Sequence, residues 1–328
     1  MRHPSRILRH AVLALALLPV ALPTSSSASP TVSRPSARPV PSPTHGGGAK
    51  LLTPFASTPT VTEVVDGFTW AEGPMWNDAT NELVFTDVSA DRIYRLSGGT
   101  ATVVTQNTGT FANGIDAGTD GSWVVCEHKT QRVRRKTGNT WTTLASTWQG
   151  KPFNSPNDSV TRADGNIYFT DPTDGSMSQF GGATVEQSFR GVFRIAPDGE
   201  VHLVDDSLQQ PNGIALDRSG TKLYVTDTQS GAIMRYTVAS NGTTGSGTQI
   251  ATVSQPDGMT VDRLGYLYIA SANGVRVLRA SGSDFGTIAV PEQPSNVAFG
   301  GTDRKRLFIT ARTSVYRVDL RIAGIAPP

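Results

Sequence analysis

The chain after Leu51 repeats one pattern of polar and apolar positions six times. Each copy begins with an oxygen-bearing residue, usually followed by Gly. It continues with a short apolar run, a polar turn and a second run rich in β-branched and aromatic residues. The copies begin at Glu72, Asn113, Asn157, Asn212, Asp257 and Asn296, at spacings of 41, 44, 55, 45 and 39 residues. Periods of this size are typical of a four-stranded propeller blade.

The second run is the clearest strand signal in each copy, because its composition favours a β-strand. It ends 14 or 15 residues after the start of its copy, at Asp87, Glu127, Asp171, Asp227, Ser271 and Ala311. The sixth copy lacks a fourth strand, which residues 60–65 can supply from before the first copy. That pairing closes the ring and removes exposed sheet edges. We therefore predict an all-β fold over residues 51–328, a six-bladed β-propeller closed by an N-terminal strand in the last blade.

The first 50 residues differ in character from the rest. Arg2, Arg6 and Arg9 precede an apolar run over residues 11–22, and small residues end at Ala28, a pattern typical of a cleavable signal peptide over residues 1–28. The run is too short for a convincing membrane span, although an uncleaved anchor is the alternative. Residues 29–50 are rich in Pro, Ser, Thr and Gly, which predicts a disordered linker. No cysteine follows the signal for a lipid anchor, so we expect a secreted or extracytoplasmic protein with no membrane contact after cleavage.

Composition and charge narrow the function classes. The 29 Lys and Arg residues nearly balance the 27 Asp and Glu residues, which argues against a nucleic-acid partner. Cys126 is the single cysteine, so an intrachain disulfide and a multi-thiolate metal site are both excluded. The sequence does not specify an oligomeric state.

The first residues of the six copies form the main candidate site. The innermost strands of a propeller run the same way along the central channel, so these six side chains should converge at one end of it. Two carboxylates and four amides, with no Lys or Arg among them, suit a hard cation such as Ca²⁺ better than Zn²⁺. The alternative is ordinary turn chemistry, because Asn-Gly and Asp-Gly are common turn formers.

The sequence also resembles a known family over residues 64–318. The matching motifs include Glu72-Gly-Pro-Met-Trp, Cys126-Glu-His128, Asn154-Ser-Pro-Asn-Asp158, Pro211-Asn-Gly213 and Pro256-Asp-Gly258. Together, in this order and at blade spacing, they resemble the senescence marker protein, gluconolactonase and luciferin-regenerating enzyme family, in particular its bacterial gluconolactonase branch.

The resemblance implies a set of site residues. It implies one divalent cation, calcium first with zinc or magnesium as alternatives, held by Glu72, Asn157, Asn212 and Asp257. It makes Asp257 the catalytic general base or nucleophile. The remaining candidates are substrate contacts, namely Asn113, His128, Asn154 and Asn296. The sequence departs from the family pattern at Lys129 and at Thr173-Asp174-Gly175, where an aromatic-containing turn is more usual.

These residues predict the hydrolysis of a lactone or related ester, as in gluconolactonases. The cation would polarise the ester carbonyl while Asp257 positions a water molecule. A non-catalytic extracellular binding propeller with a structural calcium is one alternative, and a phosphotriesterase-type hydrolase on the same site is another. A serine hydrolase triad fits poorly, because residues 51–328 contain only His128 and His202 and no nucleophile-elbow motif.

Two further features carry expectations. Asp87, Asp171 and Asp227 end the second strands and should form turns into the third strands. Residues 173–187 make the third copy the longest, and a loop of this length often forms a pocket wall. We expect it to border the substrate, and a mobile loop away from the site is the alternative.

Overall fold

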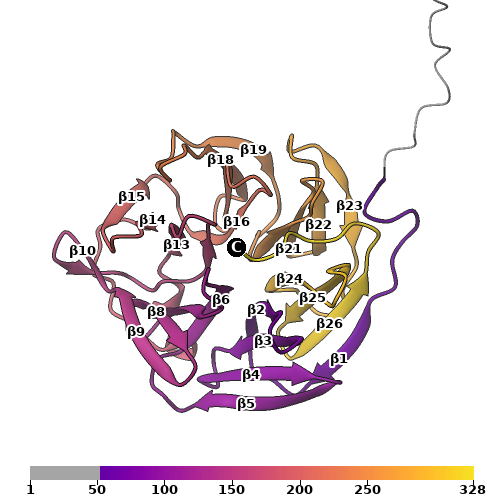
Figure 1. Ribbon diagram of the computed structural model, residues 1–328, viewed down its shortest axis with the longest axis horizontal. Coiled ribbons are helices and arrows are strands. Elements are labelled where there is room, and N and C mark those ends of the chain that lie inside the picture. The colour runs from indigo at the N-terminus through magenta and orange to yellow at the C-terminus, as the bar shows by residue number, and fades with distance from the viewer. Residues whose placement is uncertain (1–51) are drawn as a thin grey trace, which may run out of the picture. The chain divides into compact units, whose positions relative to one another are not determined.

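A computed structural model of the protein describes residues 52–328, and the predicted signal peptide and the predicted linker both lie outside this range. Six four-stranded antiparallel sheets surround a central channel as the blades of a propeller (Figure 1). Two short 3-10 turns, η1 (Asp174–Ser176) and η2 (Ser178–Phe180), are the only helical elements in this part of the chain. No helix within residues 52–328 is long and apolar enough to span a membrane. The predicted six-bladed propeller is confirmed.

Each blade runs from an innermost strand at the channel to an outermost strand. Blade 1 contains β2 (Ala71–Asn77), β3 (Glu82–Asp87), β4 (Arg92–Ser97) and β5 (Thr100–Gln106). Blade 2 contains β6 (Ala112–Ala117), β7 (Trp123–Glu127), β8 (Arg132–Thr137) and β9 (Thr140–Ala145). Blade 3 contains β12 (Ser159–Thr161), β13 (Ile167–Asp171), β14 (Gly191–Ile195) and β15 (Val201–Asp205).

The remaining blades follow the same order. Blade 4 contains β16 (Pro211–Leu216), β17 (Lys222–Asp227), β18 (Ala232–Thr237) and β19 (Thr248–Thr252). Blade 5 contains β20 (Met259–Val261), β21 (Leu267–Ser271), β22 (Gly274–Leu278) and β23 (Asp284–Ile288). Blade 6 contains β24 (Asn296–Gly300), β25 (Arg306–Ala311), β26 (Ser314–Asp319) and β1 (Thr62–Asp66). A small hairpin, β10 (Thr147–Trp148) with β11 (Lys151–Pro152), lies between blades 2 and 3.

The ring closes through the two ends of the propeller domain. Strand β1 pairs antiparallel with β26, from Thr62 opposite Arg317 to Asp66 opposite Ser314. The closing strand is the one expected from the sequence, shifted by one to two residues toward the C-terminus. Its pairing covers the edge of β26 that would otherwise be exposed.

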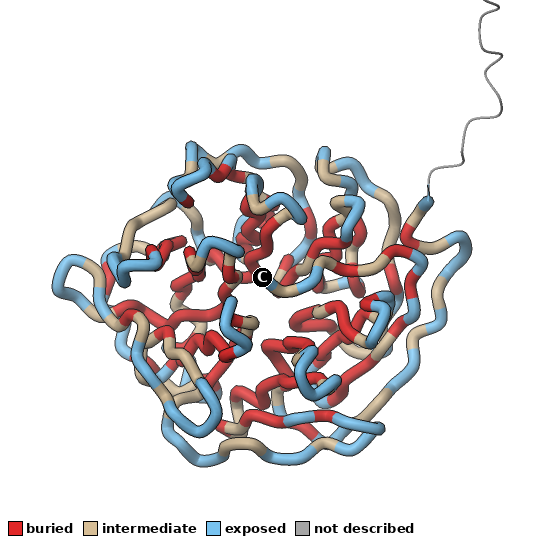
Figure 2. Tube along the Cα trace, in the orientation of Figure 1, coloured by how far each residue is buried: buried red, intermediate tan, exposed pale blue. Residues whose placement is uncertain are grey.

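The core lies between neighbouring blades rather than inside any one of them. The second strands are buried almost completely, while the residues of the outermost strands are mostly half-buried or exposed (Figure 2). Between blades 2 and 3, Phe169 stacks on Phe193 with ring centroids 5.4 Å apart, and Phe153 meets Phe169 edge-on at 5.0 Å. Each such fully buried ring contributes roughly 1.5–3 kcal/mol. Cys126 is buried in the same cluster, where burial raises the pKa of its thiol and leaves it a packing role.

Three second-strand aspartates fix the segments that lead into the innermost strands. The two carboxylate oxygens of Asp171 accept hydrogen bonds from the backbone N–H groups of Asn154 and Ser155, at 2.8 and 2.7 Å. Asp87 and Asp227 hold the equivalent pairs of N–H groups in blades 1 and 4. Asp227 Oδ1 also accepts from Gln229 N at 3.2 Å and from Ser230 N at 3.4 Å, so the expected turn into the third strand is confirmed there. Within residues 52–328, Asp87 and Asp171 instead bind the N–H groups that precede the innermost strand, so the expected turn is wrong at these two positions. Buried N–H groups outside the strand ladder need the carboxylates as partners.

Candidate functional site

The six residues that begin the repeats form a closed polar ring at one end of the channel. We call Glu72, Asn113, Asn157, Asn212, Asp257 and Asn296 the polar ring. Neighbouring members are linked through backbone contacts, such as the 2.7 Å hydrogen bond from Gly114 N to the Asn157 carbonyl. The ring closes through a 2.6 Å bond from the Ser295 hydroxyl to the carbonyl of Ala71. The predicted convergence is therefore present.

Glycine follows four ring members because the blades approach closely here. A Cβ at Gly73, Gly114, Gly213 or Gly258 would lie under 3.0 Å from the next ring member or its backbone. These Glu-Gly, Asn-Gly and Asp-Gly pairs therefore do not form hairpin turns, and they let neighbouring segments pack against each other. The turn interpretation of the pattern is wrong for these positions.

Burial distinguishes one ring member from the others. Glu72, Asn113, Asn157, Asn212 and Asn296 are each only 5–6% exposed. Asp257 is half-buried and lies just before β20. It is therefore the ring member most accessible to solvent.

The carboxyl groups of the ring repel each other. Burial raises the pKa of Glu72 to about 8, with a further contribution from the charge of Asp158. Burial also raises the pKa of Asp257 well above its usual range, and the charge of Glu72 adds to the shift. The polar side chain of Asn212 opposes the pKa increase of Asp257 only in part. A bound cation would relieve this repulsion.

Asp158 belongs to the same cluster, although the sequence analysis did not select it. Its carboxylate accepts hydrogen bonds from Ser159 N at 2.9 Å and from Asn296 Nδ2 at 3.5 Å. Burial raises its pKa to about 7. The signal that was missed is that Asp158 stands where four other repeats have Gly.

His128 lies beside the ring and contacts Asn113. The Asn113 side-chain amide donates to His128 Nε2 at 3.0 Å, which places the proton of the neutral ring on Nδ1. Burial lowers the pKa of His128 to about 4, so the ring is neutral at physiological pH. Nδ1 is buried and has no hydrogen-bond partner within residues 52–328. The predicted role of this pair in substrate contact stays a prediction.

Asn154 has a different environment from the ring. Its side-chain oxygen accepts from the backbone N–H groups of Glu186 and Gln187, and its nitrogen donates to the Phe189 carbonyl at 2.8 Å. The side chain is 1% exposed. These bonds give Asn154 a positioning role for residues 173–187, and its assignment as a substrate contact stays a prediction.

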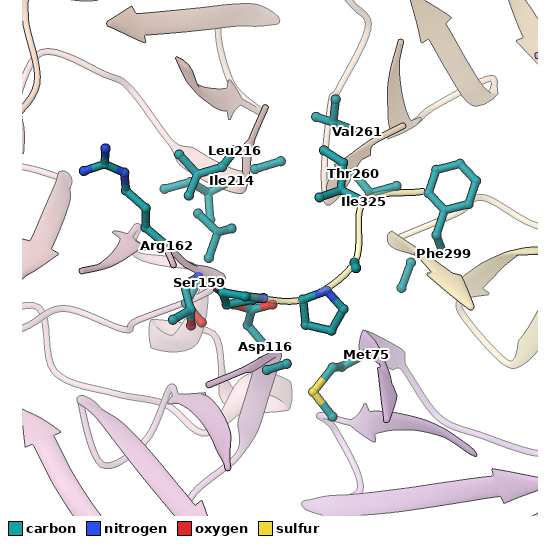
Figure 3. A pocket seen from close by; sticks show the side chains of 18 of the residues that line it. Met75, Asp116, Ser159, Arg162, Ile214, Leu216, Thr260, Val261, Phe299 and Ile325 are labelled. Atoms are coloured by element: carbon teal, nitrogen blue, oxygen red, sulfur yellow. Dashed lines mark hydrogen bonds between the residues drawn. The ribbon is translucent and has the colours of Figure 1, made fainter. Parts of the chain in front are cut away.

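A cavity of about 470 Å³ occupies the channel beyond the ring. Its walls combine apolar side chains, such as Met75, Ile214 and Phe299, with polar ones, such as Asp116, Ser159 and Arg162 (Figure 3). Residues 325–328 also line it, and Asn296 is the one ring member among its lining residues. The cavity follows the innermost strands away from the ring, so it lies on the opposite side of the ring from the segments that lead into those strands.

The donor atoms of the ring fit a hard cation. No group of three His, Cys, Asp or Glu side chains with metal-binding geometry occurs in the described range, residues 52–328. The ring instead combines two carboxylates with amide oxygens, which are ligands that Ca²⁺ accepts. The structural observation that supports this fit is that Glu72 is buried and that neither Glu72 nor Asp257 forms an ion pair with a basic side chain within residues 52–328.

Residues 70–313 match the family described as the SMP-30/Gluconolactonase/LRE-like region. The chain belongs to this family. The resemblance inferred from the motifs is thereby confirmed.

Individual relatives cover most of the chain. The gluconolactonase of Zymomonas mobilis is 32% identical over 82% of this chain and 83% of its own length. The pentonolactonase XacC of Haloferax volcanii is 28% identical over 76% of this chain and 84% of its own. Regucalcin of Xenopus laevis is 25% identical over 73% of this chain and 82% of its own length. The solved structure of a gluconolactonase from Xanthomonas campestris superimposes with a TM-score of 0.75 at 31% identity, covering 79% of this chain and 89% of the other.

Proposed function

We propose that this protein is a lactonase that opens a sugar lactone or related cyclic ester to a hydroxy acid. The observation that carries the proposal is the polar ring, which holds two mutually repelling carboxyl groups among amides in a chain of the gluconolactonase family. The gluconolactonase and pentonolactonase relatives support lactone hydrolysis as the reaction class.

Asp257 is the residue best placed to activate water. It is the half-buried member of the ring, so a substrate and a water molecule can reach it. Burial and the charge of Glu72 raise the pKa of Asp257. A cation bound between the two carboxyl groups would oppose this increase and keep Asp257 ionised, so that it can accept a proton from water.

The reaction balances with water as the second reactant. Asp257 takes a proton from water as the water oxygen adds to the carbonyl carbon of the lactone. The bond between that carbon and the ring oxygen then breaks, and Asp257 returns the proton to the leaving oxygen. The product is the open hydroxy acid.

Glu72, Asn157, Asn212 and Asp257 are the residues that would hold a divalent cation, and calcium suits their oxygen atoms best. When bound, such a cation polarises the ester carbonyl and stabilises the negative charge that develops on its oxygen. The amide side chains of Asn113 and Asn296 lie in the same ring and are the groups available to orient the substrate.

The test is a pH-indicator assay of five- and six-membered lactones on metal-stripped and calcium-restored protein. We expect turnover with calcium that falls when the metal is removed and that Glu72→Gln abolishes without unfolding the protein. Calcium binding without turnover of any lactone would favour the binding propeller instead. Hydrolysis of an organophosphate triester with no lactone activity would favour the phosphotriesterase alternative.

A further inference from the structure

The 173–187 insertion crosses the polar ring and contacts four consecutive blades. Its contacts fall on the residues that stand two positions before four ring members. The Phe180 ring meets Trp70 of blade 1 edge-on, with centroids 5.2 Å apart. A Cβ at Gly181 would lie 3.0 Å from Cγ of Phe111, which leads into blade 2.

The other two contacts are hydrogen bonds to blades 3 and 4. The Gly175 N–H donates to the Ser155 hydroxyl at 3.2 Å. The Gln210 side-chain amide donates to Oδ1 of Asp174 at 2.6 Å. Because these partners lead into β12 and β16, the insertion lies over the end of the channel that holds the polar ring.

The insertion is fixed in this position by bonds along its whole length. Lys129 Nζ donates to the Gly182 carbonyl at 2.9 Å, and Gln131 donates to the Thr184 carbonyl at 2.7 Å. Asn154 accepts from the backbone of Glu186 and Gln187. The alternative of a mobile loop away from the site does not fit these contacts.

Blade 5 is where the ring is accessible. Gln255, two positions before Asp257, is exposed, whereas Ser155 at the equivalent position of blade 3 is fully buried. Asp257 is also the half-buried member of the ring. A substrate therefore approaches Asp257 over blade 5, with the insertion on its far side.

The insertion presents one charged and one apolar side chain near the ring. Asp174 lies beside the ring at blade 4, because its carboxylate accepts from the side chain of Gln210, two positions before Asn212. Within the described residues, Gln210 binds Oδ1 of Asp174 and no hydrogen bond reaches Oδ2. Phe180 is 8% exposed and also lies edge-on to His128, with centroids 6.3 Å apart.

We propose that the insertion determines the substrate class, so that the enzyme favours small hydroxylated lactones over alkyl-substituted ones. Asp174 accepts a hydrogen bond from a substrate hydroxyl, and Phe180 limits the size of the ring substituent. Both residues determine specificity and take no part in breaking the ester bond. The inference rests on the proposed lactonase function.

The experiment compares three six-membered lactones: D-glucono-δ-lactone, δ-valerolactone without hydroxyl groups, and δ-decalactone with an alkyl chain. Asp174→Ala should lower kcat/KM for the gluconolactone about tenfold through a higher KM, because a hydrogen bond to a charged group is lost. It should leave δ-valerolactone unchanged, and Asp174→Asn should restore part of the loss. Phe180→Ala should raise kcat/KM for δ-decalactone relative to δ-valerolactone. Glu186→Gln, an exposed carboxylate on the same insertion, is the matched control.

Calorimetric calcium titration and thermal melting of each variant complete the test. Equal losses for all three lactones, or weakened calcium binding with unchanged discrimination, would show that Asp174 serves the metal site or the fold and would overturn the inference. If the wild-type protein opens none of the lactones, the proposed function fails and this inference fails with it. If the wild type is active and the variants discriminate as it does, this inference alone is wrong.

Discussion

The two sides of the polar ring are held in different ways. In blades 1, 3 and 4, a buried aspartate binds the two backbone N–H groups that precede the ring member, and the insertion covers the same segments. In blades 5 and 6, Ser271 and Ala311 stand in place of that aspartate. The segment before Asp257 accepts single hydrogen bonds instead, from Thr228 Oγ1 to the Pro256 carbonyl at 2.7 Å and from Ala272 N to the Ser254 carbonyl at 3.1 Å.

This difference indicates that the two sides of the ring have different roles, although all six blades share one repeated architecture. On the covered side, which is formed by blades 1, 3 and 4, paired hydrogen bonds fix the segments before Asn157 and Asn212. This suits residues that orient a ligand. On the open side, which is formed by blades 5 and 6, Asp257 is accessible. This suits a residue that must contact water and substrate. Changes on the open side should therefore affect catalysis most, and changes on the covered side should affect stability most.

The largest effect is expected from Asp257→Asn on the open side. Loss of the carboxylate removes the proposed base and should lower kcat/KM for a lactone by about 10³-fold. Thermal melting should stay close to the wild type, because a half-buried side chain of unfavourable charge is replaced by a neutral one. The control is Asp206→Asn on the exposed outer surface, which should keep full activity. Retention of more than a tenth of the activity in the Asp257 variant would remove Asp257 from the catalytic role.

Asp171→Ala tests the covered side through stability. The change leaves the buried N–H groups of Asn154 and Ser155 without partners and should lower the free energy of unfolding by about 3 kcal/mol. Ser271→Ala at the equivalent position of blade 5 removes one hydrogen bond, to the Gly274 carbonyl, and should cost about 1 kcal/mol. Urea unfolding of both variants gives the comparison. Equal losses would mean that the two sides are held equally well.

Asp116→Asn tests the channel wall beyond the ring by its dependence on pH. Burial raises the pKa of Asp116 from 3.8 to about 6, so the folded state favours the protonated form. The stability that Asp116 contributes is therefore present below pH 4 and is lost as the pH rises through 6, by about 3 kcal/mol. The Asn variant should lack this decline while its oxygen still accepts from Thr161 N. Unfolding curves at pH 4, 5, 6 and 7 measure the difference, and parallel curves for the two proteins would refute it.

Gly175→Ala should have the smallest effect on stability and tests the contact of the insertion. A Cβ at Gly175 would lie 2.5 Å from Cβ of Ser155, so the insertion must move away from blade 3. We expect a loss of about 1 kcal/mol and a reduced preference for the hydroxylated lactone. Gly245→Ala has no atom within 4 Å of the new Cβ and is the control. Unchanged substrate preference in the Gly175 variant would mean that the insertion does not need its observed position.

Repetition made the fold predictable. Six copies at blade spacing, with apolar second runs, identify the propeller, and the incomplete sixth copy identifies the N-terminal strand that closes it. The same spacing places the six ring residues together, since equivalent positions of a repeat occupy equivalent places around the axis. Asp158 departs from the repeat, since four other copies have Gly at this position, and its contact with Asn296 depends on the tertiary structure.

The sequence by itself determined the number of blades, the end of the channel that holds the oxygen-bearing side chains, and the family to which the chain belongs. Only the tertiary structure showed why Gly follows four ring members, where Asp87, Asp171 and Asp227 direct their carboxylates, and how the insertion crosses four blades. The physical reason is the range of the interactions involved. A strand pattern is recorded locally in the chain, whereas close approach between blades and the path of a loop depend on partners that are distant in sequence.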